Sequence, residues 1–238
     1  MKPAKISKKA IVLLSGGLDS TTCLAIAQSR GFNIYALTIQ YGQRHQAELL
    51  AAKKIARHYQ VQKHLILKIP LTAWGGSSLT DLKLNVAQSR SFQSMAQGIP
   101  ETYVPARNLI FLSLALAWGE TLHVEDFFIG VNVLDYSGYP DCRPAFIHQF
   151  EKLARLGTKL GVEQNWKLKI HTPLIHLAKH QIIQEGTRLG VNYAWTHSCY
   201  HPRPNHAPCL KCDSCLLRAK GFQLANLEDP LLNRFFRK

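Results

Sequence analysis

The stretch SGGLDS, residues 15–20, constrains the possible folds of this chain more than any other. An apolar run, residues 10–14, leads into it, and residues 20–29 follow with the composition of an apolar helix. Glycine permits a tight turn and lets the backbone approach a ligand closely. A helix that starts at such a turn offers unpaired N–H groups and a positive partial charge, which together favour anions. The stretch therefore predicts a strand, a tight turn and a helix, with an anion site at the turn.

Strand-like and helix-like segments alternate along most of the chain. Besides 10–14, apolar and β-branched runs predict strands at 33–42, 64–69, 126–131 and around 166–170. Helical spacing of apolar residues predicts helices over 20–29, 45–60, 105–119, 145–157 and 178–189. Alternation of this kind predicts βαβ units. The expected fold class is α/β, with a doubly wound, mainly parallel, Rossmann-like sheet.

Two parts of the chain break the alternation. Residues 71–104 are polar and irregular, and so long an irregular stretch in a compact domain commonly serves as a lid. The C-terminal part is rich in cysteine. We therefore expect a nucleotide-binding α/β domain at 1–194, including the lid-like 71–104, and a small metal-binding segment at 195–238.

Cysteine spacing in the C-terminal segment indicates a metal site. Three cysteines have the spacing Cys-x-x-Cys-x-x-Cys, and a fourth precedes them. These four are Cys199, Cys209, Cys212 and Cys215. Four thiolates suit one tetrahedral, structural Zn²⁺, and a reducing cytosol disfavours disulfides. Two alternatives stay open, an iron–sulfur cluster and replacement of one cysteine by His197, His201 or His206.

The composition narrows the range of partners. The formal net charge of +14 attracts polyanions such as nucleotides, acidic small molecules or tRNA. No apolar run approaches the ~20 residues that span a bilayer, and the apolar run near the N-terminus is too short for a signal peptide. We expect a cytoplasmic protein with no membrane partner.

The glycine turn has a specific pattern, Ser-Gly-Gly-x-Asp-Ser. It matches neither the Walker A loop nor G-x-G-x-x-G. It resembles the pyrophosphate loop of ATP-pyrophosphatases, which generally cleave ATP to AMP and pyrophosphate. The alternative is a tight turn that needs glycine only for its geometry. The residues expected to bind ATP are Leu14, Ser15, Gly16, Gly17, Leu18, Asp19, Ser20, Thr21, Thr22, Cys23 and Leu24.

Two residues of this run have further expected roles. The charge of Asp19 would repel phosphate, so it is expected to stabilise the helix N-terminus or to bind Mg²⁺ that bridges to phosphates. Cys23 lies on the apolar helix and is expected to pack in the core as well.

Distinctive segments are spread over nearly the whole chain: LSGGLDSTTCL (14–24), YGQRH (41–45), SSLTD (77–81), YVPARN (103–108), DYSGYPDCRP (135–144), TPL (172–174), SCY (198–200) and CLKCDSCLLRAKGF (209–222). Together they resemble one family, the 7-cyano-7-deazaguanine synthases of the PP-loop ATP pyrophosphatases. The combination is more specific than the glycine loop alone. The chain departs from the family pattern at Gln40, where Asp is usual, and at Ala145, where an acidic residue is common.

The resemblance implies an ATP-dependent carbon–nitrogen ligase of queuosine precursor biosynthesis. It would convert 7-carboxy-7-deazaguanine and ammonia to 7-cyano-7-deazaguanine through adenylated intermediates, with ATP and Mg²⁺ as cosubstrate. It also implies one Zn²⁺ and a homodimer, and it does not imply direct tRNA binding.

Six further residues are expected to serve catalysis under this resemblance. Arg44 and His45 would approach ATP or the reacting carboxylate, and Arg107 and Asn108 would neutralise carboxylate or phosphate charge. Asp135 or Asp141 would accept from the guanine-like N–H edge, while Tyr136 or Tyr139 would stack on the base. For each, the alternative is an ordinary loop residue.

Two other functions stay open from the residues alone. A tRNA-modifying PP-loop pyrophosphatase, of the thiolation or lysidine type, would also adenylate an oxygen and would use the positive charge. A zinc-ribbon module that binds nucleic acid without ATP turnover would bind in a salt-sensitive way.

Overall fold

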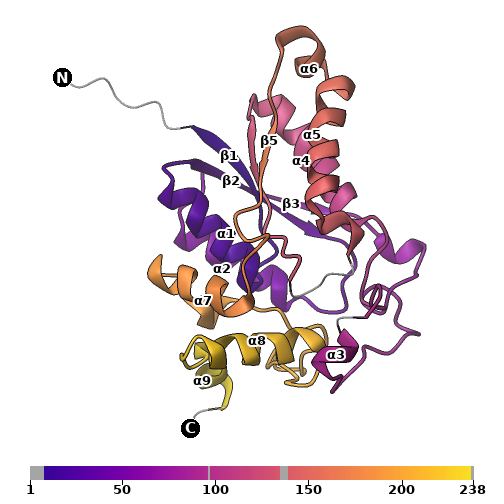
Figure 1. Cartoon of the computed structure of the whole chain (residues 1–238), viewed down its shortest axis with the longest axis vertical. Helices are drawn as coiled ribbons and strands as arrows, with labels where there is room; N and C mark the ends of the chain where they lie inside the picture. The colour runs from indigo at the N-terminus through magenta and orange to yellow at the C-terminus, as the bar shows by residue number, and fades with distance from the viewer. Residues whose placement is uncertain (1–7, 96, 135–138, 237–238) are drawn as a thin grey trace, which may run out of the picture.

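The computed structural model describes residues 8–95, 97–134 and 139–236. A five-stranded sheet lies at its centre (Figure 1). The strands are β1 (Lys9–Leu13), β2 (Asn33–Gln40), β3 (Lys63–Lys68), β4 (Asp126–Phe128) and β5 (Lys169–His171). All neighbours pair in parallel, in the order β3-β2-β1-β4-β5. This confirms the predicted doubly wound α/β fold.

Helices cover both faces of the sheet. Side chains on both sides of β1 are therefore buried, and its sequence is a continuous apolar run after Lys9. Ala10 and Val12 point to one face and pack with α1 (Leu18–Ser29), α2 (Ala47–His58) and α7 (Lys179–Arg188). Ile11 and Leu13 point to the other, where α4 (Arg107–Leu122) and α5 (Pro144–Gly157) lie. The short α6 (Lys159–Gln164) continues from α5 at the end of the molecule away from the C-terminus (Figure 1).

The observed boundaries differ from the predicted ones where a ligand-binding edge is formed. The first helix begins at Leu18 and not at residue 20, so that the glycine turn leads directly into its first turn. The helix predicted from 105 begins at Arg107, after Ala106, whose φ is +54°. Strand β4 ends at Phe128, before Gly130, at which a Cβ would lie 3.0 Å from the carbonyl of Asp19. The glycine thus lets the chain after β4 pass close to α1.

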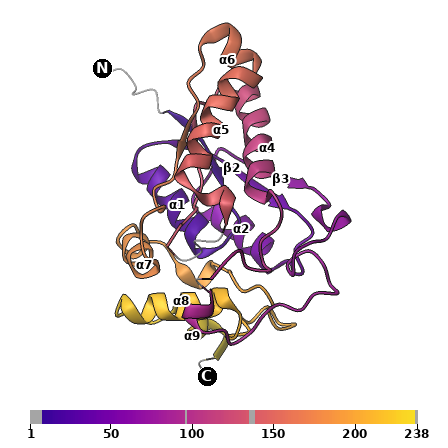
Figure 2. The ribbon, with the colours of Figure 1, turned by 45° about the vertical axis from the view of Figure 1, so that its right-hand side comes forward.

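Residues 71–104 contain little regular structure, as predicted. Apart from residue 96, which is not described, they hold one 3₁₀ turn (Leu71–Ala73) and the short α3 (Phe92–Met95). An antiparallel bridge joins Gln88 to Cys212, and Arg90 forms an ion pair with Asp213 at 3.2 Å. The segment is therefore held against the cysteine-rich part of the chain, and both ribbon views place α3 beside α8 (Asp213–Leu224) (Figure 2).

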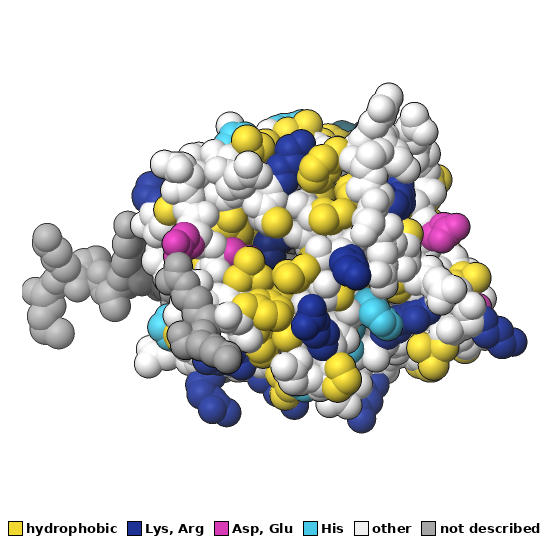
Figure 3. All heavy atoms as spheres, turned by 90° about the horizontal axis from the view of Figure 1, so that it is seen from below, with side chains coloured by type: hydrophobic (Ala, Val, Ile, Leu, Met, Phe, Trp, Pro, Cys, Tyr) yellow, Lys and Arg dark blue, Asp and Glu magenta, His cyan; other side chains and the backbone are white. Residues whose placement is uncertain are grey.

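The C-terminal part is more helical than its sequence suggested. It contains α8 and α9 (Pro230–Phe236), and Phe222 of α8 packs into the same core cluster as Ile182 of α7. Viewed from this end, hydrophobic side chains gather near the centre of the surface, with Lys and Arg side chains around them (Figure 3). The division of the chain at residue 194 stays a prediction.

Candidate active site and metal site

A pocket opens at the carboxyl ends of β1, β2 and β4, the edge at which parallel α/β sheets bind ligands. Its wall combines the glycine loop, the first turns of α1, α2 and α4, and residues of α7 and α8. Of the predicted site residues, it is lined by Leu14, Ser15, Gly17, Leu18, Asp19, Ser20, Arg107 and Asn108. Two segments far apart in the sequence, both predicted to act on ATP or the carboxylate, thus meet in one cavity.

Hydroxyl groups hold the glycine loop in shape. The Oγ atoms of Ser15 and Ser20 lie 3.0 Å apart, and the Gly17 N–H donates to Ser15 Oγ at 3.2 Å. The Thr21 hydroxyl donates to the Gly17 carbonyl at 2.7 Å. Gly17 is the N-cap of α1 and its position supplies no capping side chain. The first N–H groups of the helix consequently face a pocket that can hold an anion.

The rest of the predicted ATP-binding run lies behind the pocket wall. Gly16 has a φ of +88° and packs against α2, so it shapes the loop. Thr22, Cys23 and Leu24 are fully buried, and Thr22 Oγ1 lies 2.8 Å from the hydroxyl of Tyr193. Cys23 packs in the core, as expected.

Asp19 has a partner that the sequence did not reveal. Lys179, the first residue of α7, donates to both carboxylate oxygens of Asp19 at 2.8 Å. The ion pair lines the pocket beside the first turn of α1. It brings a cation next to the predicted phosphate site, although the charge of Asp19 alone would repel phosphate.

Arg107 lies between two aromatic rings. Its guanidinium carbon is 5.9 Å from the ring centroids of both Tyr41 and Tyr139. Burial raises the pKa of Tyr41 to about 12, so that ring stays neutral and gives Arg107 a cation–π contact. A half-buried guanidinium in the pocket can pair with a carboxylate or a phosphate through two parallel hydrogen bonds.

Asp141 is bound to the start of α4. Its Oδ2 accepts from the Asn108 backbone N–H at 2.8 Å, and the Asn108 side-chain amide donates to Cys142 Sγ at 3.2 Å. Asp141 is buried and does not line the pocket. Burial raises the pKa of Cys142 to about 12, so this cysteine remains a thiol.

The predicted base-contacting residues divide into two groups. Asp135 and Tyr136 lie outside the described residues. Tyr139 lines the pocket, and its hydroxyl lies 2.9 Å from Thr102 Oγ1.

Arg44 and His45 do not line the pocket. Arg44 donates to the backbone carbonyls of Ser78 at 2.7 Å and of Asp81 at 2.6 Å, and also to that of Leu84. It therefore holds residues 78–84 in place.

His45 lies against the cysteine-rich segment. Its ring is 5.5 Å from that of His197, and burial lowers the pKa of both, to about 4 for His197. The two imidazoles are therefore neutral at physiological pH.

Sequence reasoning missed three charged residues of the pocket. Glu48 lies in the first turn of α2, Lys179 begins α7, and Arg218 comes from α8. Glu48 and Lys179 lie near the starts of predicted helices that follow predicted strands, and this position could have indicated that they reach the ligand-binding edge of the sheet. Arg218 lies in a part where no helix was predicted.

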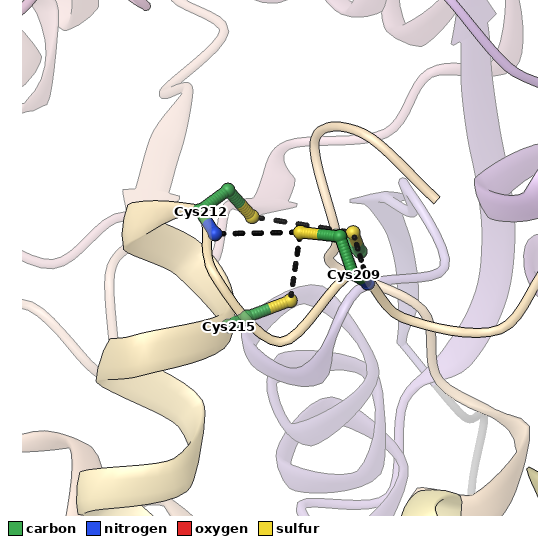
Figure 4. A group of neighbouring side chains, drawn as sticks. Cys209, Cys212 and Cys215 are labelled. Atoms are coloured by element: carbon green, nitrogen blue, oxygen red, sulfur yellow. Dashed lines mark hydrogen bonds between the residues drawn. The ribbon is translucent and has the colours of Figure 1, made fainter. Parts of the chain in front are cut away.

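The four predicted cysteine ligands come together at the start of α8. The sulfurs of Cys199, Cys209, Cys212 and Cys215 all lie within 4.8 Å of one another. Figure 4 shows the last three pointing to a common centre, with Cys215 on the first turn of the helix. Backbone N–H groups donate to the sulfurs, from Cys209 to Cys199 at 3.2 Å and from Cys212 to Cys209 at 3.3 Å.

The spacing of the sulfurs fits one metal ion. Cys209 and Cys215 sulfurs are 3.9 Å apart, and those of Cys199 and Cys212 are 4.0 Å apart. Four sulfurs placed tetrahedrally at about 2.3 Å from Zn²⁺ would be about 3.8 Å from each other. Within the described residues, His197, His201 and His206 belong to no metal-ligating group, so the set consists of the four cysteines.

None of the helices in the described part of the chain combines the length and the apolar character needed to cross a bilayer.

A parallel α/β fold, a pyrophosphate-type loop at its ligand-binding edge and a four-cysteine cluster define a nucleotide-binding protein of the PP-loop class.

The family model described as queuosine biosynthesis protein QueC matches residues 9–226, and the chain belongs to this family.

Relatives agree over nearly the whole chain. The 7-cyano-7-deazaguanine synthase of Desulfatibacillum aliphaticivorans is 56% identical over 223 residues, covering 94% of this chain and 95% of that protein. The synthase of Solidesulfovibrio magneticus is 56% identical over 223 residues, covering 94% of each chain. Among solved structures, NMN synthetase from Francisella tularensis has a TM-score of 0.50 at 17% identity, covering 95% of this chain and 79% of that one. This last likeness concerns the fold.

Proposed function

We propose that the protein is an ATP-dependent 7-cyano-7-deazaguanine synthase, which converts 7-carboxy-7-deazaguanine and ammonia to the nitrile. The observation that carries the proposal is that the uncapped glycine loop and the half-buried Arg107 line one pocket of a QueC-family chain. One element suits the phosphates of ATP and the other suits a carboxylate.

The first half of the reaction makes an amide. A carboxylate is a poor electrophile, so its oxygen attacks the α-phosphorus of ATP, and pyrophosphate leaves. Ammonia then attacks the acyl adenylate, AMP leaves with its electron pair, and the amide remains. The second half repeats the activation on the amide oxygen, and loss of AMP gives the nitrile. Both adenylates react with water, so the pocket has to exclude it.

The pocket residues divide these tasks. Ser15, Gly17 and Ser20 hold phosphates through the loop and the helix N-terminus, with the cation of Lys179 beside them. Mg²⁺, when bound with ATP, would neutralise phosphate charge, and Asp19 is its proposed ligand. Arg107 pairs with the reacting carboxylate, and Asn108 supports it from the same turn of α4.

We further propose that the four cysteines hold Zn²⁺ with a purely structural role. Sulfurs within 4.8 Å of one another favour a single ion over an iron–sulfur cluster. The proposal also includes a cytoplasmic homodimer that uses ammonia, either free or supplied by a separate partner, and direct tRNA binding is not expected. The tRNA-modifying alternative is not favoured, since the relatives cited above are named 7-cyano-7-deazaguanine synthases.

Mass spectrometry of a complete reaction tests the function. Purified, metal-loaded protein is incubated with ATP, Mg²⁺, ammonium and 7-carboxy-7-deazaguanine. We expect nitrile, together with AMP that forms only when the carboxylate is present. Arg107→Met, which removes the cation and keeps a long side chain, is expected to lower the rate at least about 100-fold. Arg57→Met, on the exposed side of α2, is the matched control.

Absence of both nitrile and carboxylate-dependent AMP from folded protein would contradict the proposal. In that case, release of AMP on addition of unmodified tRNA would support the tRNA-modifying alternative.

A further inference from the structure

Glu48 occupies a position that the assignments above leave without a role. It lies in the first turn of α2, directly behind the glycine loop, where a Cβ on Gly16 would be 2.3 Å from the Glu48 carbonyl oxygen. Glu48 also lines the pocket that holds Arg107. Glu48 thus lines the same pocket as the loop proposed for ATP and the guanidinium proposed for the substrate carboxylate.

The other carboxyl groups at this site are bound to protein partners. Both oxygens of Asp19 accept from Lys179 at 2.8 Å, and Asp141 accepts from the Asn108 N–H at 2.8 Å. Within residues 8–95, 97–134 and 139–236, the carboxyl group of Glu48 accepts no hydrogen bond and forms no ion pair. It does not cap α2 either, since the N-cap is Gln46 and no capping hydrogen bond is formed.

The charged and titratable groups around Glu48 come from three directions. Burial raises the pKa of its carboxyl group to about 7, opposed by Arg107 of α4 and supported by Cys212 before α8. Tyr41, after β2, is also within electrostatic range and stays neutral. A carboxyl group that changes protonation near neutral pH can both accept and release protons at the working pH.

The proposed reaction releases protons from nitrogen at two stages. When ammonia attacks the acyl adenylate, a C–N bond forms, the C–O bond to AMP breaks, and the former ammonia nitrogen must lose one proton. When the amide becomes a nitrile, oxygen adenylation and departure of AMP remove both remaining N–H protons, and those electron pairs form the C≡N bond. Neither stage requires an oxidant or reductant, but each requires a proton acceptor next to the nitrogen.

We propose that Glu48 is the catalytic base that takes these protons from the reacting nitrogen. The assignment rests on the proposed synthase function. It separates adenylation of the carboxylate, which involves no nitrogen and needs no such base, from the two later stages, which do. The acceptor returns each proton to solvent before it takes the next, so the carboxylate is regenerated three times in each turnover.

Glu48→Gln tests the assignment because it keeps the size and polarity of the side chain. Adenylation is followed by carboxylate-dependent exchange of labelled pyrophosphate into ATP, without ammonia. Amide formation from the carboxylate and nitrile formation from synthetic amide are followed separately by mass spectrometry. Glu163→Gln, an exposed acid on α6, is the matched control, and Glu48→Asp tests whether a shorter carboxylate restores part of the rate.

For Glu48→Gln, we expect the rate of pyrophosphate exchange to stay within about threefold of the wild-type rate. The rates of amide and nitrile formation should fall at least ~100-fold. The wild-type rate of nitrile formation should rise with pH through a value near 7, and Glu48→Gln should lose this rise. Amide and nitrile formation by Glu48→Asp should be at least about tenfold faster than by Glu48→Gln.

Two results overturn the assignment. A parallel loss of exchange would mean that Glu48 serves binding or folding, and nitrile formation within tenfold of wild type would mean that no base is needed there. If the wild-type protein itself makes no nitrile, the proposed function fails, and the assignment fails with it.

Discussion

Gly16 sets the distance between the glycine loop and α2. Its φ is +88°, and a Cβ there would lie 2.3 Å from the Glu48 carbonyl oxygen and 2.6 Å from the Ala52 nitrogen. Both neighbouring atoms belong to the backbone of α2, which cannot move aside as the end of a flexible side chain can. The position therefore requires glycine both for its conformation and for its space.

We predict that Gly16→Ala lowers the free energy of unfolding by about 3 kcal/mol or more and lowers the affinity for ATP. Gly31→Ala is the matched control, because Gly31 also has a positive φ of +82° but a Cβ there meets nothing within 4 Å. It should cost only about 1 kcal/mol. Urea unfolding and ATP titration measure the two effects, and equal losses in both variants would refute the role of the close contact.

The raised pKa of Glu48 also leads to a prediction about stability, which can be tested without measuring activity. Its pKa rises from 4.5 to about 7 on folding, so the folded state binds this proton more tightly. The resulting stabilisation is complete below pH 4.5 and is lost as the pH rises through 7. Wild type should therefore lose up to about 3 kcal/mol relative to Glu48→Gln between pH 5 and pH 8.

Urea unfolding of both proteins at the two pH values measures this difference. The comparison cancels the pH dependence of the cysteine site, which both proteins share. Parallel behaviour of wild type and Glu48→Gln would show that the pKa of Glu48 is not raised.

Single residues differ in how far the sequence reveals them. The glycines and cysteines could be predicted because a local pattern identifies them, and their placement agrees with the expected strand–turn–helix and metal geometry. The partnership of Asp19 with Lys179 joins positions that are distant in the chain, and no local pattern encodes it. Arg44 was predicted to approach ATP, but its hydrogen bonds go to backbone carbonyls that only the fold brings near.

At the scale of elements, Arg44 ties the long irregular segment to the sheet. It follows β2, and its guanidinium donates to three carbonyls in residues 78–84. Hydrogen bonds to a charged donor are stronger than neutral ones. The start of the lid-like segment is consequently fixed, while residues further along are held by α8 and the cysteines.

We predict that Arg44→Met lowers the free energy of unfolding by about 2–3 kcal/mol and speeds proteolysis within residues 77–101. Arg57→Met, on the exposed side of α2, is the control and should change neither. Limited proteolysis with mass mapping measures the effect. A raised KM for ATP with unchanged proteolysis would instead support the contact with ATP predicted from the sequence.

Elements with strong periodicity were predictable, and their ends were less so. The five strands and the helices between them follow apolar patterns that the sheet buries on both faces. The start of α4 was misjudged by two residues because Pro105 usually marks the first helical turn, whereas here Ala106 adopts a positive φ before Arg107. Helix α8 was not predicted because cysteine spacing, and not apolar periodicity, dominates its first turn.

At the scale of the whole molecule, the cysteine-rich part of the chain contacts two segments that are distant in the sequence, around Gln88 and Gly16. Cys212 bridges to Gln88, the His197 N–H donates to the Gly16 carbonyl at 2.9 Å, and Arg218 forms a buried ion pair with Asp229 at 2.6 Å. A metal ion that orders the four cysteines would thereby also order one side of the glycine loop.

We predict one Zn²⁺ per chain, whose removal by a chelator lowers the melting temperature by more than about 10 °C. Cys212→Ala should lose the metal and give less folded protein. Cys23→Ala, in the core of α1, should keep one ion per chain. Elemental analysis and thermal unfolding measure both, and a stable metal-free protein that loses only turnover would contradict a structural role.

The hydrogen bond from His197 to Gly16 has a consequence for the timing of synthesis. Chains leave the ribosome N-terminus first, at about 5–20 residues per second. The glycine loop emerges early, but the segment that completes its surroundings follows only after the rest of the sheet has been translated. A nascent or truncated chain that lacks the cysteine segment therefore cannot form the finished pocket, and the proposed use of ATP would not begin before the protein is whole.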